Sequence, residues 1–548
     1  MRGQDSESSQ VAESRYPRLR VRSPAHRAPT RCSQTTRTHM NTLRTLFAAA
    51  LLPAAALQSP VAGQSGQTLF TIVDAGPLAG PTRSVEALAF PPAVPTATRT
   101  VLGLPPAIPA ASVTAIAALG LSTAAVPNGA IVVLGTGPLA GPFAEIHVLR
   151  FVPGANTLAP ITLNVGLPSA VVIRDLHRTD TGCVLVLAED QSANPLVYRV
   201  SATPNGTTFN PLLVPLSGLP LNVAAWSSIG SGPNGNVLIA GQTTTGGTAA
   251  FSAPTQGGAL TGVGGGAFLG LAVEADLTGS VHVGGAPPLT PLGASNAACG
   301  GFPTVLGPIN PTGIAPVVAD LEVVAGTLPG LATGVAFGNL LVAISSIISF
   351  SPQGARSTSI VYRAGGVGPP PCPLTTAALV PLFAYPAPLV NEVFAVRKIA
   401  FWDAMNSYGC ECAAAGAGGR PILVGTDATG APSAFASRGS SYNVFFGFDA
   451  PGVPPGATAS VLNIGANPIA FPLGSPVNGG GSKVCDVLDD FFNTGTGGVS
   501  LSGFGVPATA MFNIPNDPTL AGAILYFQGA TATGAELVTS PALFVTIL

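Results

Sequence analysis

Three pairs of carboxylates are the residues of this 548-residue chain whose types and spacing could perform chemistry. Each pair lies near the end of an apolar run, at comparable points of successive stretches. Two carboxyl groups about 5 to 10 Å apart can hydrolyse glycosidic bonds, and carboxylate oxygens also suit calcium. We favour a third interpretation, in which these acids are solvated turn residues. The pairs are Glu189 with Asp190, Glu274 with Asp276, and Asp320 with Glu322.

The histidines give no comparable pattern. Beyond residue 64 there are three, and they are His147, His177 and His282. None has a partner at metal-site spacing, and the sequence contains no His-Glu-x-x-His motif. A Gly-x-Ser-x-Gly elbow of the α/β-hydrolase kind is also missing. We therefore assign no catalytic, metal-binding or cofactor-binding residue, and expect the histidines to pack within strands or to face solvent.

Residues 40–63 have the composition of a secretory signal peptide. Arg44 supplies a positive start, Leu46 to Leu57 is apolar, and Val61-Ala62-Gly63 offers small residues for cleavage before Gln64. The apolar run is shorter than the about 20 residues of a membrane-spanning helix. We expect a secreted protein, extracellular or periplasmic, with no membrane span in its mature form.

Residues 1–39 contain eight arginines and no periodic apolar face. We expect a disordered leader that results from a start codon assigned too far upstream, the true start being Met40. An organellar transit peptide is the alternative, because such segments are rich in arginine and serine. The acidic residues Asp5, Glu7 and Glu13 count against it.

Removing residues 1–63 leaves 13 basic and 21 acidic residues, a net charge near −8. The sequence shows no basic patch, so nucleic acid and anionic membranes are not expected partners. Only 8% of the residues are charged, whereas 47% are hydrophobic. Apolar β-branched runs separated by glycine and proline are typical of an all-β protein with many short strands.

Six cysteines remain after the signal peptide, an even number that suits disulfides in an oxidising compartment. Cys410 and Cys412 would point to opposite faces of a strand and reach different partners. Cys372 and Cys485 are the natural candidates for those partners, although the sequence does not fix the connectivity. The full set of disulfide candidates is Cys183, Cys299, Cys372, Cys410, Cys412 and Cys485.

Internal repetition is the strongest indication of architecture. The sequence Gly-Pro-Leu-Ala-Gly-Pro occurs at residues 76–81 and again at 137–142, each time between two strand-like runs. Diverged copies of this hairpin follow, often with another apolar strand in front. Six units of roughly 50 residues fit between Leu69 and Gly365, and three or four strands per unit are typical of a propeller blade.

This repeat pattern resembles the bacterial secreted β-propellers of the NHL-like kind, over about 300 residues and without a diagnostic motif. The resemblance implies a propeller of about six blades over residues 68–365. A β-helix or a pair of sandwiches is the alternative.

Residues 366–371 are a Gly/Pro-rich linker, and residues 372–548 are expected to form a disulfide-containing β-sandwich. The segments 512–518, 525–529 and 539–543 resemble the C-terminal module of many Gly/Ala/Pro-rich secreted bacterial proteins of unassigned function. That resemblance implies an extracellular sandwich without known active residues.

Two classes of function remain open. The first is a non-catalytic binding or structural protein that engages an unknown extracellular glycan or protein, and the small number of titratable residues favours it. The alternative is an extracellular hydrolase or lyase that acts on polysaccharide with carboxylates at the propeller axis. An enzyme should gather charged residues, with His177 or His282, in one deep central cleft, whereas a scaffold would leave the channel lined by Gly, Ala and Thr.

Overall fold

The computed structural model describes most of the chain from Gln67 to Leu548, so the leader expected at residues 1–39 and the signal peptide expected at 40–63 lie outside the described residues. Within this span the following positions are not described: 78, 91–96, 121–129, 153, 233–235, 267–268, 276–280, 287–291, 296–303, 306–313, 324–339, 352–353, 365–378, 386–390, 403–406, 413–419, 431–432, 449–452, 474–484, 490–498 and 534–535.

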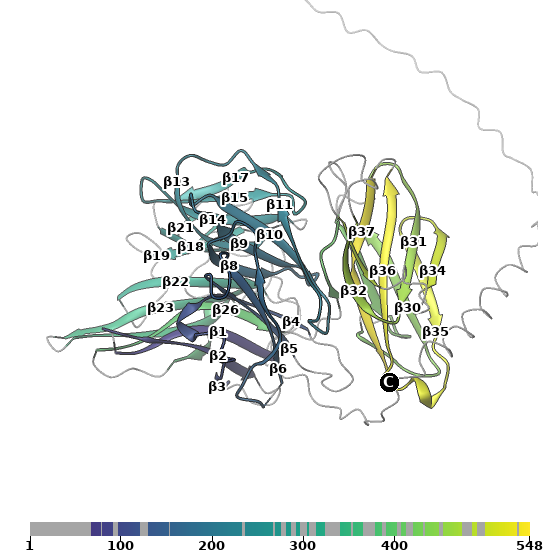
Figure 1. Ribbon diagram of the computed structural model, residues 1–548, viewed down its shortest axis with the longest axis horizontal. Coiled ribbons are helices and arrows are strands. Elements are labelled where there is room, and N and C mark those ends of the chain that lie inside the picture. The colour runs from purple at the N-terminus through teal and green to yellow at the C-terminus, as the bar shows by residue number, and fades with distance from the viewer. Residues whose placement is uncertain are drawn as a thin grey trace, which may run out of the picture. The chain divides into compact units, whose positions relative to one another are not determined.

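The first part of the chain is a β-propeller of six blades, each with four antiparallel strands, and a single parallel bridge between Ser357 and Val393 joins blades 1 and 6 into one sheet (Figure 1). Listed from the innermost strand outwards, blade 1 is β26 (Glu392–Trp402), β1 (Gln67–Pro77), β2 (Thr82–Phe90) and β3 (Thr98–Leu102). Blade 2 is β4 (Val113–Gly120), β5 (Ala130–Thr136), β6 (Glu145–Phe151) and β7 (Ala159–Gly166). Blade 3 is β8 (Val172–Arg178), β9 (Val184–Glu189), β10 (Pro195–Ala202) and β11 (Phe209–Val214).

The remaining blades repeat this order. Blade 4 is β13 (Val223–Ser231), β14 (Val237–Thr243), β15 (Thr248–Ala253) and β17 (Thr261–Gly266). Blade 5 is β18 (Leu269–Ala275), β19 (Val281–Ala286), β20 (Leu292–Ser295) and β21 (Thr304–Val305). Blade 6 is β22 (Ile314–Val323), β23 (Leu340–Ser351), β24 (Gly354–Ala364) and β25 (Leu379–Ala384). The short elements between blades are η1 (Ala110–Ser112) and β12 (Leu216–Ser217), and β16 (Gly258–Ala259) lies within blade 4, between β15 and β17.

The innermost strands form a closed ring. Each contacts the innermost strands of both neighbouring blades, in the order β26, β4, β8, β13, β18, β22 and back to β26. The repeated Gly-Pro-Leu-Ala-Gly-Pro sequence connects β1 to β2 and β5 to β6, which are the second and third strands of blades 1 and 2. The two copies are therefore equivalent, and the hairpin repeat read from the sequence is confirmed.

The ring is closed by a strand from beyond the expected linker. β26 pairs with β1 in antiparallel orientation, and β25 pairs with β24. The propeller therefore extends to Trp402, and the boundary expected at residues 366–371 has to move past this strand. Among the described strands only β26 covers the inner edge of β1, which would stay unpaired without it.

Burial on both faces explains the continuous apolar runs of the second strands. In β5, Ile131 and Val133 pack in a cluster with blade 3, whereas Val132 and Leu134 pack in a cluster with blade 1. Successive side chains of a strand point to opposite faces, and here each face meets a neighbouring blade.

The last part of the chain is a β-sandwich, as expected. One sheet contains β27 (Ser407–Tyr408), β37 (Glu536–Ile547), β36 (Ile524–Thr533), β31 (Ala457–Gly465) and β34 (Val499–Phe504), with β29 (Phe435–Ala436) also on β37. The other contains β28 (Pro421–Thr426), β30 (Ser441–Phe448) and β35 (Ala508–Asn513). A separate pair is β32 (Pro468–Leu473) with β33 (Cys485–Asp489), and η7 (Pro518–Leu520) precedes β36.

Aromatic residues fill the space between the two sheets. The rings of Phe512 and Phe527 lie 5.3 Å apart. Gly529 leaves room for Phe446 of the facing sheet, because a Cβ at that glycine would lie 2.3 Å from the Phe446 ring. A side chain at residue 529 would therefore force the two sheets apart.

A disulfide joins Cys183, directly before β9, to Cys410, two residues after β27. The expected partners of Cys410 were Cys372 and Cys485, so this pairing differs from the expectation. Cys412 is disulfide-bonded as well, so the two neighbouring cysteines have different partners, as their strand spacing predicted. The bond links residues 227 positions apart, a separation that sequence spacing cannot reveal.

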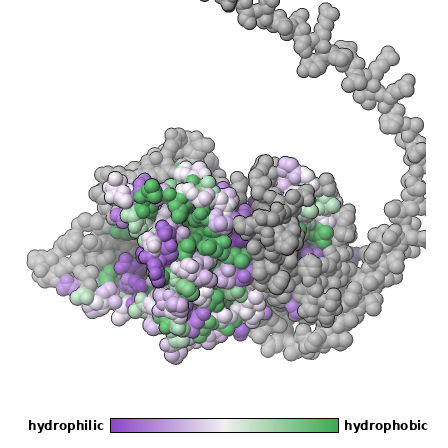
Figure 2. Space-filling model, turned by 45° about the horizontal axis from the view of Figure 1, so that its top comes forward, coloured by the Kyte–Doolittle hydropathy of each residue, from purple (hydrophilic) through white to green (hydrophobic). Residues whose placement is uncertain are grey.

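Polar and apolar residues are interspersed over the described surface of the face seen in Figure 2. Within the described residues no helix is long and apolar enough to cross a membrane.

Candidate functional site

Every innermost strand of the propeller contains a β-bulge at the same place. In each blade the register against the second strand shifts by one residue, so that one residue of the innermost strand has no partner. A bulge re-aims its side chain and is common beside functional sites. We call the six unpartnered residues the bulge ring; in the order of the blades they are Arg397, Thr114, Arg174, Ser227, Leu271 and Ala319.

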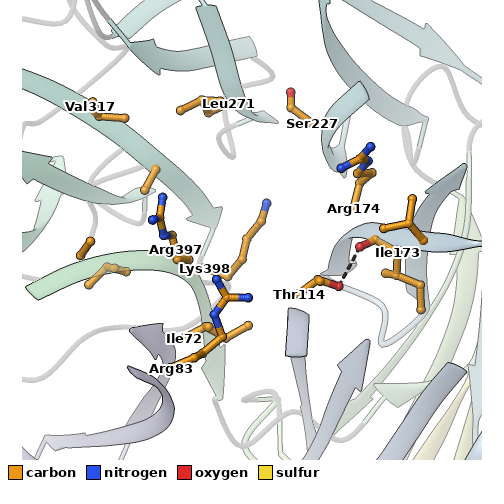
Figure 3. Close-up of a pocket in the computed structure, with 14 residues that line it drawn as sticks. Ile72, Arg83, Thr114, Ile173, Arg174, Ser227, Leu271, Val317, Arg397 and Lys398 are labelled. Atoms are coloured by element: carbon orange, nitrogen blue, oxygen red, sulfur yellow. Dashed lines mark hydrogen bonds between the residues drawn. The ribbon is translucent and has the colours of Figure 1, made fainter. Parts of the chain in front are cut away.

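All six residues of the bulge ring line one pocket of about 400 Å³ at the propeller axis (Figure 3). This volume lies within the range of about 300 to 1,000 Å³ that is usual for small-molecule sites. Each bulge residue is partly or fully exposed, whereas the residue that follows it is buried in every blade. The bulge residues therefore form a solvent-accessible layer at the propeller axis, and the residues that follow them form a buried layer beneath it.

Four cationic side chains line this pocket, although the sequence showed no basic patch: Arg83, Arg174, Arg397 and Lys398. They come from blades 1 and 3, and only the fold brings them together. In Figure 3 their side chains converge on the cavity. No Asp or Glu is among the described residues that line it.

The arginines form ion pairs with carboxylates that are not among the residues lining the pocket. Asp74 accepts bonds from Arg83 Nε at 2.7 Å and from Arg397 Nε at 2.8 Å. Burial raises the pKa of Asp74, but the hydrogen bonds from the two arginines outweigh burial and lower it. Arg174 Nη2 donates to Glu189 Oε2 at 2.7 Å. These ion pairs fix the guanidinium groups in position, and the remaining N–H groups face the pocket.

The layer beneath the bulge ring contains a buried ion-pair network. Lys398 Nζ lies 2.7 Å from Asp175 Oδ1 and 3.5 Å from Asp320 Oδ1. Burial lowers the pKa of Lys398, but the two carboxylates more than offset it, so the pKa is raised. Burial also raises the pKa of Asp320 to about 7, against the opposing effect of Lys398.

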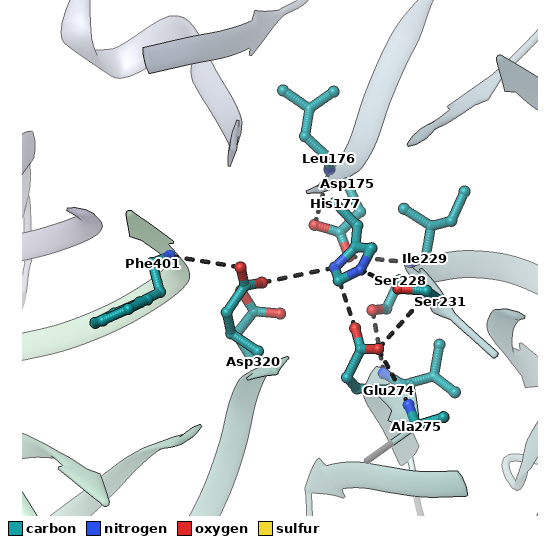
Figure 4. Close-up of polar contacts among 12 residues, drawn as sticks. Asp175, Leu176, His177, Ser228, Ile229, Ser231, Glu274, Ala275, Asp320 and Phe401 are labelled. Carbon is teal, nitrogen blue, oxygen red and sulfur yellow. Dashed lines mark hydrogen bonds and ion pairs between the residues drawn. The ribbon is translucent and has the colours of Figure 1, made fainter. Parts of the chain in front are cut away.

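A second cluster lies two residues further along the strands (Figure 4). His177 Nδ1 lies 3.1 Å from Glu274 Oε2 and 3.6 Å from Glu322 Oε2, and its Nε2 lies 2.6 Å from Ser231 Oγ. Burial lowers the pKa of His177, but the two glutamates outweigh it and raise the pKa to about 9. Burial raises the pKa of Glu274 to about 8, although His177 acts in the opposite direction. Near neutral pH these shifts favour an imidazolium at His177 and a Glu274 carboxyl that keeps its proton.

Gly230 makes room for this cluster. A Cβ at this glycine would lie 2.3 Å from the backbone oxygen of Val273 and 2.9 Å from Glu274 Oε2. Only a residue without a side chain lets β13 and β18 approach closely enough for Glu274 to reach the backbone N–H of Ser231.

The axial acids also fasten neighbouring blades to one another. Asp175 accepts from the backbone N–H of Ile229 at 3.0 Å, and Asp320 accepts from that of Ile399 at 2.8 Å. Glu322 accepts from Phe401 N at 3.4 Å. A charge-assisted hydrogen bond of this kind satisfies a backbone donor that would otherwise be buried without a partner.

The sequence predictions for these acids are partly corrected. Glu274, Asp320 and Glu322 are not solvated turn residues: their exposed fractions are 0%, 5% and 4%. Asp190 is a turn residue, since it caps the loop after β9 through the backbone N–H of Asn194. Asp276 lies outside the described residues.

Glu189 lies at the end of the second strand of blade 3, so it is not equivalent to Glu274 and Glu322. Glu274 and Glu322 do occupy equivalent positions, because each lies three residues after the bulge residue of its innermost strand. Calcium ligation gains no support, because no group of three or more possible ligands is arranged for a metal ion among the described side chains.

The three histidines lie in different environments. His147 is buried within blade 2, where its Nε2 lies 3.0 Å from Thr136 Oγ1. His282 is buried in β19, the second strand of blade 5, where it is the register partner of Glu274. Both pack within blades, as expected. His177 alone lies on an innermost strand and joins the axial cluster.

The bulge ring, Lys398 and Ser231 were not predicted from the sequence. A signal for them exists, because each innermost strand contains a five-residue pattern whose second residue is the bulge, whose third is small or polar, and whose fourth is aliphatic. The six copies are VTAIA at 113–117, IRDLH at 173–177, WSSIG at 226–230, GLAVE at 270–274, VADLE at 318–322 and VRKIA at 396–400.

Comparison with known proteins gives no family for this chain. No family model matches it, and no curated protein matches it. Among solved structures it is similar to an α-L-arabinanase of Penicillium chrysogenum, at 11% identity and a TM-score of 0.33 over 48% of this chain and 82% of that one. It is also similar to an exo-β-1,3-galactanase of Phanerochaete chrysosporium, at 11% identity and a TM-score of 0.29 over 84% and 89%. Similarity at this level supports no conclusion about activity, and the NHL-like resemblance stays a hypothesis.

Proposed function

We propose that this chain is a secreted, non-catalytic binding protein whose propeller takes a ligand into the axial pocket. One observation carries the proposal: the bulge ring opens a pocket of small-molecule size, while the axial carboxylates are buried beneath it. The concave site, with apolar walls and a few convergent polar groups, has the composition of a ligand site.

The competing function is a carboxylate-dependent hydrolase or lyase. Of its two structural requirements, the structure meets the gathering of charged residues at the axis but not the pair of carboxyl groups beside a substrate. His177 and four acids gather at the axis, as expected for an enzyme. A glycosidase, however, needs two carboxyl groups that flank the substrate. The axial acids bind Lys398, His177 and backbone N–H groups instead, and none is among the described residues that line the pocket.

A serine hydrolase is a second candidate, favoured by one observation. Ser231, His177 and Glu274 are connected in the order of a nucleophile, a base and an orienting acid. Such triads are recognised by geometry and roles. The base must be neutral to accept the serine proton, and the pKa of His177 is raised to about 9. We therefore expect Ser231 to be unreactive at neutral pH and the histidine to act as a cation that holds the glutamates.

The test is a ligand screen by ligand-observed NMR, with neutral and acidic sugars, oligosaccharides and small organic acids. The matched variant is Ala319→Trp, which fills the pocket from the bulge ring, and its unfolding midpoint serves as the folding control. Ligands that bind the natural chain and not the variant support the proposal. A screen without a binder, or binders that Ala319→Trp leaves unaffected, would overturn it.

The enzymatic candidates are tested on the same protein. Arabinan, galactan and polyuronate are incubated with it, and the release of reducing ends is measured. A fluorophosphonate probe is applied at pH 7 and at pH 9.5, with Ser231→Ala as control. Turnover of a polysaccharide, or labelling at pH 7 that Ser231→Ala abolishes, would replace the binding function by a hydrolase.

Export of the protein belongs to the same proposal. The buried Cys183–Cys410 disulfide supports it, because such bonds persist in oxidising compartments. Sequencing the N-terminus of the mature protein from the extracellular or periplasmic fraction should give Gln64 as the first residue. Retention of residues 1–63 in a cytoplasmic protein would contradict export.

A further inference from the structure

The bulge ring is polar on one side and apolar on the other. Because the innermost strands follow one another in a closed ring, the positions of the bulge residues follow from the order of the blades. Arg397, Thr114, Arg174 and Ser227 are consecutive, in blades 1 to 4, and Leu271 and Ala319 follow in blades 5 and 6. A ligand in this ring meets polar side chains on one side and hydrocarbon on the other. The hydroxyls of Thr114 and Ser227 donate to the backbone oxygens of Ile173 and Ala240, so the donors on the polar side come from the two arginines.

The two arginines of the ring keep donors available for a ligand. Arg83 uses Nε and Nη2 for Asp74 and Nη1 for the Val113 oxygen. Within the described part of the chain, by contrast, Arg397 donates only Nε to Asp74 and Arg174 only Nη2 to Glu189. Their side chains are 57% and 42% exposed, against 25% for Arg83. Arg83 therefore positions the site, and the two ring arginines face the ligand.

The balance of charge limits the ligand to a small anion. Four cations line the pocket, and four buried carboxylates lie within ion-pair distance of them: Asp74, Glu189, Asp175 and Asp320. The site as a whole is close to neutral, although its accessible surface offers donors. A polyanion would find too little positive charge here, whereas one carboxylate suits the planar fork of an arginine.

We propose that the axial pocket recognises a carboxylate on its ligand, bound by the terminal nitrogens of Arg174 and Arg397, with the carbon skeleton against Leu271 and Val317 of the apolar side. This inference rests on the proposed binding function and names its ligand class. The carboxylate can belong to an acidic sugar or to an acid with a hydrocarbon body. Both present the same group to the arginines, and they differ in what they present to the apolar side.

The experiment is isothermal titration of the full chain with four probes: glucuronate, glucose as its neutral match, glucose 6-phosphate as the more highly charged match, and hexanoate. We expect glucuronate or hexanoate to bind at least tenfold more tightly than glucose. Glucuronate as the better ligand indicates an acidic sugar, and hexanoate indicates an apolar acid. Glucose 6-phosphate should bind more weakly than the preferred carboxylate.

The matched variants are Arg174→Gln and Arg397→Gln, with Arg438→Gln as a control because Arg438 contacts Leu548 outside the propeller. We expect each pocket variant to weaken carboxylate binding about tenfold or more, and the control to leave it unchanged. Unfolding midpoints of all variants show whether the fold is kept.

The outcomes separate this inference from the proposed function. If glucose binds as tightly as glucuronate and Ala319→Trp abolishes both, the pocket is a binding site and its carboxylate preference is refuted. If carboxylates bind but neither pocket arginine affects them, the inference is also refuted. If no carboxylate binds while the screen yields neutral ligands that Ala319→Trp blocks, only the inference fails. If the screen is empty too, both fail.

Discussion

Alkaline pH should destabilise this propeller strongly, because its axial cluster holds protons that the unfolded chain releases. The two neighbouring glutamates outweigh burial and raise the pKa of His177 from 6.5 to about 9, and burial raises the pKa of Glu274 from 4.5 to about 8. Groups with a raised pKa in the folded state stabilise it fully at a pH below their unfolded values. That contribution is lost as the pH rises through the folded values.

The size of the effect follows from the number of protons. Between pH 7 and pH 9 both groups are deprotonated in the unfolded chain, while the folded chain loses its two protons only gradually. Each proton contributes about 1.4 kcal/mol per pH unit. The free energy of unfolding should therefore fall by about 3 kcal/mol over this interval, which is a large part of the usual stability of a domain.

The assay is urea-induced unfolding at pH 6, 7, 8 and 9. The matched variant is Glu274→Gln, which resembles the protonated carboxyl in shape and does not titrate. In this variant we expect the loss between pH 7 and pH 9 to shrink by about 1 kcal/mol. A stability that stays constant or increases from pH 7 to pH 9 in the natural chain would refute the protonated cluster.

Three further changes test the same architecture by urea or thermal unfolding. Asp175→Ala leaves Lys398 with one carboxylate and should cost about 3 to 5 kcal/mol, whereas Asp175→Asn should cost less; equal costs would contradict an ionic role. Gly230→Ala places a Cβ 2.3 Å from the Val273 oxygen and should cost more than about 3 kcal/mol or prevent folding; a neutral result would show that the innermost strands are further apart. Cys410→Ser opens a loop of 227 residues and should lower the free energy of unfolding by about 2 to 5 kcal/mol; unchanged stability under oxidising conditions would argue against the bond.

The axial acids could be recognised in the sequence, but their burial could not. Glu274, Asp320 and Glu322 were singled out by comparable places in the repeats; of these, Glu274 and Glu322 occupy equivalent positions, whereas Asp320 aligns with Ala272. Their burial could not be predicted, because it arises from packing against strands that lie far away in the chain. Asp320, for example, contacts the N–H of Ile399, 79 residues later.

The cationic pocket shows the same limit. Beyond residue 63 the chain is acidic and has no run of basic residues, so its composition pointed away from nucleic acid and anionic membranes as partners. Arg174 and Arg397 meet only because blades 1 and 3 lie on either side of blade 2 in the ring. Their direction depends on the bulges, which change the side of the strand that a residue faces.

What the sequence by itself determined are the features that depend on neighbouring residues. Alternating and continuous apolar runs specified the strands, and the repeated Gly-Pro-Leu-Ala-Gly-Pro turn specified an equivalent hairpin in two blades. Local backbone preferences and burial act over a few residues, so they are visible in the chain.

The tertiary structure alone decided how the ring closes and what gathers at its axis. β26 could have belonged to either domain by its composition, and it closes the propeller because β1 offers an otherwise unpaired edge. Closure then brings the bulge ring, Lys398 and the His177 cluster together from blades that are far apart in sequence. Distances of this kind depend on the geometry of the whole ring, and no local pattern encodes them.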